Sequence, residues 1–198
     1  MKKIIGYFAA ASAACFTLFL ISICPADAFQ VPDTGITECY DAAGNQLNPC
    51  PGPGEDYYGQ DGNLIHNGMS FTDNADGTLT DNVTDLLWQQ AASATAQTWS
   101  QAVSSCDALN AAALGGHTSG WRLPDLVELH SIMDLSQTTG AAAIDPVFTG
   151  TQAAAYWTST EDADDSANAW ILDFGTTEDG IAAKASTKYV RCVWEVAP

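Results

Sequence analysis

The chain has 198 residues, of which 46% are hydrophobic and 10% aromatic, enough for one sizeable core and too few for two. Its 24 acidic and 6 basic residues give a formal net charge of −18 at pH 7. So acidic a surface repels nucleic acid and anionic membranes, and neither is expected as a partner. Sulfated, heparin-like glycans are disfavoured for the same reason, unless Lys184, Lys188 and Arg191 gather locally.

The first 28 residues have the pattern of an export signal. Lys2 and Lys3 precede an apolar run over residues 4–23, and Ala26-Asp27-Ala28 has the form of a cleavage site. We expect cleavage after Ala28 and a secreted, periplasmic or cell-surface location. An uncleaved membrane anchor is the alternative, because the run is long enough to span a bilayer. Cleavage leaves 4 basic and 23 acidic residues, and hence a net charge of −19.

Four cysteines remain after residue 28, an even number that predicts two disulfides in an exported protein. Cys39 and Cys50 close a short loop rich in glycine, asparagine and proline. Cys106 falls on a predicted helix and Cys192 on the last predicted strand. Of the three connectivities we therefore predict Cys39–Cys50 with Cys106–Cys192. No C-x-x-C motif or histidine cluster accompanies the cysteines, which disfavours zinc binding and redox chemistry.

The sequence after the signal divides into two parts. Residues 29–69 are rich in proline and glycine and predict an irregular arm stapled by the first disulfide. Residues 70–198 predict the main domain. It opens with short strands at 70–73 and 78–81, joined by a turn whose Asp76-Gly77 pair is a strong hairpin signal.

A first helix is predicted after Thr98. Thr98 and Gln101 have the spacing of a capping box, and apolar residues then recur at helical intervals until Gly115-Gly116. This periodicity places Cys106 on the buried face. Residues 89–97, which precede the helix, are interpreted as a polar connection.

The stretch around Arg122 leads into a second helix. Asp125 and Glu128 form another capping box, which predicts a helix over residues 126–134. Arg122 follows the large aromatic Trp121 in a chain with many carboxylates. A half-buried guanidinium needs several planar partners. We therefore expect Trp121, Arg122 and Glu128 to be structural, with Arg122 as an internal clamp.

The C-terminal quarter has the alternation typical of strands. The predicted strands are 156–160, 169–174, 180–185 and 189–196. Val190, Cys192 and Trp194 share one face of the last strand, and Arg191 is expected to be structural, paired with acids or carbonyls. Two capped helices therefore precede an antiparallel sheet whose last strand is tied to the first helix. The predicted class is α+β, with two helices packed on a twisted antiparallel sheet.

Four motifs follow one another along the chain, at residues 72–84 continuing into 87–89, 120–124 with 128–129, 156–161, and 189–193. In this order they resemble the motifs of the Lcl C-terminal domain family, formerly domain-of-unknown-function family 1566. The resemblance covers about residues 71–194, and parts of 33–62 resemble the leader that often precedes this domain. It implies a C-type-lectin-like fold, related to that of the formylglycine-generating enzyme, in exported bacterial surface proteins and adhesins. Asp85 stands where the family usually has glycine, and the collagen-like repeats of some relatives are absent from this sequence.

No motif for catalysis is recognised in the sequence. It lacks a G-x-S-x-G elbow, an H-E-x-x-H motif and a phosphate-binding glycine loop, and His66, His117 and His130 stand in unrelated contexts. We therefore expect a non-enzymatic, adhesin-like module that binds a glycan or a surface protein. A structural assembly protein is the second hypothesis and an enzyme the third. The oligomeric state, including a homo-oligomer, is left open.

The predicted binding site is the acidic loop at residues 161–168, between strands that carry two tryptophans. Aromatic faces can stack on sugars, and carboxylates and amides can hydrogen-bond around them. The resemblance implies the same region, because loops here are the usual recognition surface of lectin-like folds. The candidate ligand-binding residues are Trp157, Ser159, Glu161, Asp162, Asp164, Asp165, Asn168, Trp170 and Asp173.

Calcium is the alternative use of this loop, held by Glu161, Asp162, Asp164 and Asp165. A solvated acidic turn has the same composition, and the metal-binding motifs of animal C-type lectins are missing. No cofactor is therefore expected.

Overall fold

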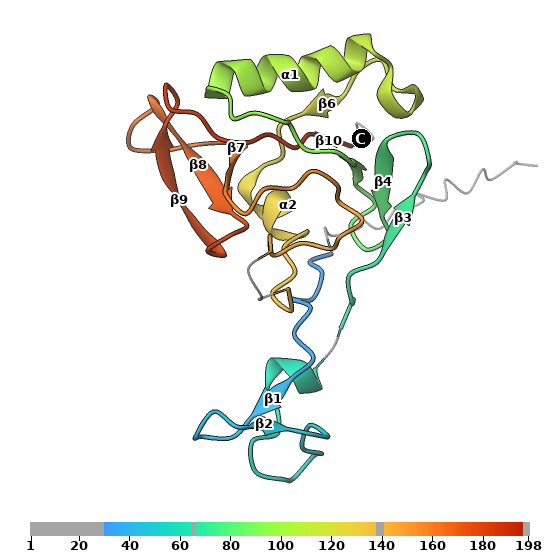
Figure 1. Ribbon diagram of the computed structural model, residues 1–198, viewed down its shortest axis with the longest axis vertical. Helices are drawn as coiled ribbons and strands as arrows, with labels where there is room; N and C mark the ends of the chain where they lie inside the picture. The colour runs from blue at the N-terminus through green and yellow to red at the C-terminus, as the bar shows by residue number, and fades with distance from the viewer. Residues whose placement is uncertain (1–29, 65, 138–140, 196–198) are drawn as a thin grey trace, which may run out of the picture.

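The computed structural model describes residues 30–64, 66–137 and 141–195 (Figure 1). The predicted signal segment, residues 1–28, lies outside these ranges. The described part is a mixed α+β structure with two α-helices and three antiparallel sheets, as the sequence predicts at the level of class. None of its helices has the length and apolar character needed to cross a membrane.

A small arm stands at one end of the molecule, at the bottom of Figure 1. Its strands β1 (Cys39–Tyr40) and β2 (Gln46–Leu47) pair antiparallel, and a short 3-10 turn spans Asp61–Asn63. The Cys39–Cys50 disulfide closes the arm, which confirms the first predicted pairing. Near its base the Leu135 amide donates to the Thr34 carbonyl at 2.9 Å, which joins the arm to the main domain.

A five-stranded sheet forms one side of the main domain. Its order is β3 (Phe71–Asp73), β4 (Thr78–Asp81), β5 (Leu87–Gln89), β10 (Val193–Trp194) and β6 (Trp121–Arg122). The hairpin of β3 and β4 is confirmed, with Thr72 opposite Thr80. Strand β10 pairs with β5 on one side and β6 on the other, so segments far apart in sequence meet here.

The last predicted strand, residues 189–196, is much shorter in the structure. Only Val193–Trp194 joins the sheet. Upstream, the Gln97 and Lys188 backbones exchange hydrogen bonds of 2.8 and 2.9 Å, and Val190 accepts from the Ser93 amide at 2.9 Å. The backbone groups that a continuous strand would use are therefore bonded to the segment that precedes the first helix.

A separate three-stranded meander forms the other side. Strands β7 (Ala155–Glu161), β8 (Asn168–Asp173) and β9 (Glu178–Ala183) pair antiparallel in that order. The prediction of one sheet is therefore wrong. Within the described residues, an isolated bridge between Tyr156 of β7 and Tyr189 connects the meander to the segment that precedes β10 of the larger sheet.

Both helices begin at the predicted caps. Helix α1 (Trp99–Ala111) has the capping box of Thr98 and Gln101, and α2 (Leu126–His130) has that of Asp125 and Glu128. Helix α2 ends four residues before the predicted boundary. The Ser131 hydroxyl donates to the Glu128 carbonyl at 2.7 Å, which satisfies one of the acceptors at the end of the helix.

The core consists of two clusters of buried side chains. The larger joins the two sheets and α2, and its members include Leu79, Trp88, Leu129, Ile132, Phe148, Tyr156, Leu172, Phe174 and Val193. The second lies beneath α1 and contains Ala102, Cys106, Trp121, Leu123, Trp157, Ala169, Val190 and Cys192. The Cys106–Cys192 disulfide is buried in this second cluster and confirms the second predicted pairing.

Candidate functional site

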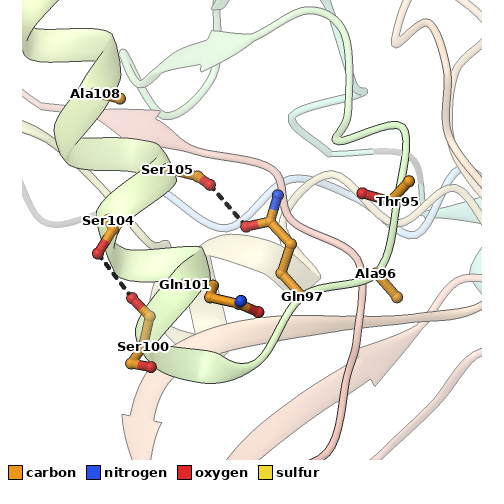
Figure 2. A pocket seen from close by; sticks show the side chains of 8 residues that line it. All are labelled: Thr95, Ala96, Gln97, Ser100, Gln101, Ser104, Ser105 and Ala108. Atoms are coloured by element: carbon orange, nitrogen blue, oxygen red, sulfur yellow. Dashed lines mark hydrogen bonds between the residues drawn. The ribbon is translucent and has the colours of Figure 1, made fainter.

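An open groove of about 590 Å³ lies between α1 and the segment before it (Figure 2). Its lining residues are Thr95, Ala96, Gln97, Ser100, Gln101, Ser104, Ser105 and Ala108. None of the eight is charged or aromatic, and six carry a hydroxyl or an amide. The groove is thus a polar, uncharged surface on a strongly acidic protein.

The helical repeat forms one wall of the groove. Ser100, Ser104 and Ala108 follow one another at four-residue intervals, which stacks them along one face of α1. Because these side chains are small, they do not fill the groove, which therefore remains open. Figure 2 shows Ser100 and Ser104 one above the other along the helix, and Ser105 pointing towards Gln97.

The opposite wall is the segment 95–97, which backbone bonds hold in place. Gln97 pairs with Lys188 through an isolated bridge, and its carbonyl also accepts from the Trp157 indole at 2.8 Å. The two walls are joined directly, because the Ser105 hydroxyl donates to the Gln97 side-chain oxygen at 2.7 Å (Figure 2). The groove is therefore held in shape from both sides.

Hydroxyl and amide groups both donate and accept hydrogen bonds, so this lining matches a ligand with the same groups. Besides Ser105 and Gln97, two further side chains are partly committed to the protein itself. The Ser104 hydroxyl donates to the Ser100 carbonyl at 3.0 Å, and the Gln101 side chain accepts from the Thr98 amide at 2.9 Å in the helix cap.

The start of α1 also meets the predicted acidic region. The Trp99 indole donates to the Thr158 carbonyl at 2.9 Å, and the Lys184 amine lies 4.4 Å from the centre of the Trp99 ring. The same amine lies 3.1 Å from Glu161. Glu161, one of the predicted ligand residues, is therefore paired with a lysine that lies against the first residue of α1.

The remaining acids of the loop mainly stabilise its turns. The Asp162 side chain accepts from the Asp164 amide at 3.0 Å, and Asp165 accepts from the Ala167 amide at 3.0 Å and the Asn168 side chain at 3.3 Å. Among the residues whose placement is described, no group of three or more histidines, cysteines or acids could hold a metal ion. The composition of the loop thus follows from turn chemistry.

The structure does not bring the predicted ligand residues into one site. The expectation that Trp157 offers its ring to a ligand is wrong, because this side chain is completely buried in the second cluster. Trp170 is partly exposed on β8, opposite Ile181 of β9, and Ser159 is exposed on β7. Asp173 lies at the far end of β8 from the acidic loop, about 17 Å along the strand.

Arg122 makes planar contacts with two acids. Its two terminal nitrogens each lie 2.7 Å from an oxygen of Glu128, and one also lies 2.9 Å from Glu195. The hydrogen bonds with Glu128 raise the pKa of the Arg122 guanidinium above its usual value. Glu128 also accepts from the Asp125 amide at 2.7 Å, so one carboxylate caps α2 and binds β6.

Arg191 is completely buried and is bound mostly by carbonyl groups. It donates to the carbonyls of Gln89 and Gln90 at 2.6 and 2.5 Å and to the Thr151 hydroxyl at 2.6 Å. Burial lowers the pKa of Arg191 to about 10, so it remains a cation at neutral pH. Enclosed in this way, Arg191 cannot join Lys184 in an exposed basic patch for sulfated glycans.

The sequence alone does not predict the groove, because each of its two walls, taken separately, has the pattern of a common structural element. The segment 95–97 resembles a connection, and the polar face of α1 resembles a solvated helix surface. Small polar residues at four-residue spacing, with no charge among them, are the signal that could have directed attention here.

The fold and this surface define a class: a disulfide-bonded α+β domain with an open polar groove beside its long helix. Residues 77–194, which include the groove, match the sequence model described as the Lcl C-terminal domain. The chain therefore belongs to the Lcl C-terminal domain family. No curated protein matches the chain.

Proposed function

We propose that this protein is an exported, non-enzymatic binding module of the cell surface or extracellular space, which recognises a glycan or protein ligand in an adhesin-like role. In this proposal the main domain has the C-type-lectin-like fold that its family membership implies. The observation that carries the proposal is the open, uncharged groove along α1, which is lined by hydroxyl and amide groups.

The chemistry of the groove supports a hydroxyl-rich or amide-rich ligand. Such a ligand replaces the water that hydrates the serine, threonine and glutamine side chains with hydrogen bonds of the same kind. Sulfated glycans and nucleic acids fit poorly, because the rest of the surface is acidic. A neutral glycan, or the backbone of an extended peptide, has the required groups.

The same residues argue for binding rather than catalysis. A serine nucleophile needs a base within hydrogen-bonding reach. Here the Ser105 hydroxyl donates to the amide oxygen of Gln97, which is too weak a base for that role. Export is supported by the two disulfides, since disulfides form and persist mainly in oxidising compartments.

A structural assembly protein without a small ligand is the second candidate. Val127 on α2 and Ile181 on β9 are large apolar side chains that remain exposed. A contact with a second copy of the chain would bury such side chains.

A glycan array followed by calorimetry on residues 29–198 tests the proposed function. Ser104→Trp fills the groove and is expected to abolish binding of whichever ligand the array identifies. Asp107→Trp is the matched control, because Asp107 is exposed on the same helix and does not line the groove.

Equal loss in both variants, or unchanged binding in Ser104→Trp, would place the site elsewhere. Calcium and a chelator are compared in the same titrations, and the affinity is expected to be the same with both. An array without any ligand, together with a stable oligomer in solution, would favour the assembly protein.

A further inference from the structure

Three tyrosines are exposed on the arm, at the opposite end of the molecule from α1 (Figure 1). Tyr40, Tyr57 and Tyr58 have exposed fractions of 45%, 48% and 43%. We call these three residues the tyrosine surface. It lies outside residues 77–194, which match the family, and the proposed groove does not involve it.

One glutamine holds the backbone of this surface together. Gln60 accepts from the Tyr40 amide at 2.9 Å and donates to the carbonyls of Tyr40 at 2.8 Å and Tyr57 at 2.9 Å. Tyr57 has a φ of 67°, a conformation that costs free energy for a residue with a side chain. The tyrosines are therefore presented on a backbone that is already ordered, which reduces the entropy lost on binding.

The arm carries negative charge and no positive side chain apart from the ionisable His66. Residues 30–69 contain six carboxylates and no lysine or arginine. Glu55 and Asp56 are exposed immediately before Tyr57, and Asp41 follows Tyr40. Hydrogen bonds from Asn45 lower the pKa of Asp41, so this carboxylate is charged at neutral pH.

We propose that the tyrosine surface binds an arginine-rich segment of a partner protein. A guanidinium is attracted to the face of an aromatic ring, and the neighbouring carboxylates can accept its hydrogen bonds. The acidic surface of the whole chain would also steer a cationic partner towards the protein. Anionic partners are repelled, and a neutral glycan would use the rings without using the charges.

Fluorescence anisotropy on residues 29–198, with labelled nona-arginine as the probe, tests this proposal. Nona-arginine is expected to bind more tightly than nona-lysine, because guanidinium stacks on aromatic rings better than ammonium. Its binding is expected to weaken as the salt concentration is raised.

Replacing all three tyrosines by serine is expected to weaken nona-arginine binding by roughly tenfold or more. Tyr57→Phe with Tyr58→Phe keeps the rings and should retain most of the affinity.

The control variant removes negative charge from the acidic loop and leaves the arm unchanged. Asp162→Asn with Asp164→Asn takes two charges from the acidic loop and is expected to weaken nona-arginine binding by only about threefold or less. Peptide mapping without reduction, and the unfolding midpoint, show that each variant is folded. If the triple variant does not fold, Tyr58→Ser and Tyr58→Phe are compared alone.

Equal losses in the tyrosine and loop variants would overturn the proposal, because nona-arginine would then respond only to overall charge. Equal affinity for nona-lysine and nona-arginine would also overturn it. So would tyrosine-dependent binding of cellohexaose without binding of nona-arginine, an outcome that would identify a neutral glycan surface instead.

Discussion

The two arginines of the main domain have different surroundings. Arg122 is bound by two carboxylates and remains partly exposed, with 40% of its side-chain surface accessible. Arg191 is enclosed, with Phe148 4.9 Å from its guanidinium, and most of its partners are backbone carbonyls. Substitution at each position should therefore have a different cost.

We expect Arg122→Lys to lower the free energy of unfolding by about 1 to 2 kcal/mol, because lysine keeps the charge but cannot bind both oxygens of Glu128. Arg191→Lys should cost more, about 3 kcal/mol or more, because buried carbonyls lose their donors where water cannot replace them. Urea unfolding followed by tryptophan fluorescence measures both. The reverse order of costs would contradict this account of the two sites.

Local signals in the sequence were reliable at the residue scale. The capping boxes at Thr98 and Asp125 and the Asp76-Gly77 turn lie where the sequence predicts them. Each depends on side chains only a few residues apart, so it can be read without knowing the fold. The burial of Trp157 could not be read in this way, because it depends on α1 packing over β7.

At the scale of elements, the two disulfides have different effects on stability. Cys39 and Cys50 are 11 residues apart within the arm, whereas Cys106 and Cys192 are 86 residues apart and join α1 to the segment entering β10. The longer loop loses more conformational freedom in the unfolded chain when it is closed. The second disulfide should therefore contribute more to the stability of the main domain.

Replacing Cys106 and Cys192 together by alanine is expected to lower the free energy of unfolding by about 4 kcal/mol. The matched change of Cys39 and Cys50 to alanine should leave the unfolding midpoint of the main domain nearly unchanged. Thermal unfolding by near-ultraviolet circular dichroism measures both, because all six tryptophans are in the main domain. An equal shift in the two double variants would be inconsistent with this assignment.

The sheet arrangement could not be predicted from patterns along the chain. Alternation identified β7, β8 and β9 individually, but the division into two sheets depends on which backbone groups face one another. Segment 188–190 bonds to Ser93 and Gln97 instead of extending β10. The same contacts build one wall of the groove, so the part of the fold that the sequence missed is also the part that forms the candidate site.

At the scale of the whole molecule, the arm and the main domain meet at few points. Apart from the chain linking them, the contacts come from residues 31–37 of the arm. The Thr34 carbonyl accepts from the Leu135 amide, Gly35 approaches Asp134, and the buried Pro32 lies in the same region. Both core clusters consist only of main-domain residues. The rest of the arm, residues 38–64, should therefore contribute little to the stability of the main domain.

A chain that begins at residue 66 is expected to fold, with a free energy of unfolding lower by about 1 to 3 kcal/mol than that of residues 29–198, because it lacks the buried Pro32 and the hydrogen bond to Thr34. Ligand binding in the groove should be retained, and nona-arginine binding should be lost. Urea unfolding and the two binding assays measure these effects. A shortened chain that did not fold would show that the arm is part of the main domain.

Strand β10 also determines when the five-stranded sheet can form during folding. Val193 pairs with Trp88, which precedes it by 105 residues, and the same strand separates β5 from β6. During synthesis β5 and β6 emerge long before the strand that must lie between them, so the five-stranded sheet cannot close until residue 194 has left the ribosome. The sheet therefore forms after synthesis and not during it, an order that is compatible with the export that we propose.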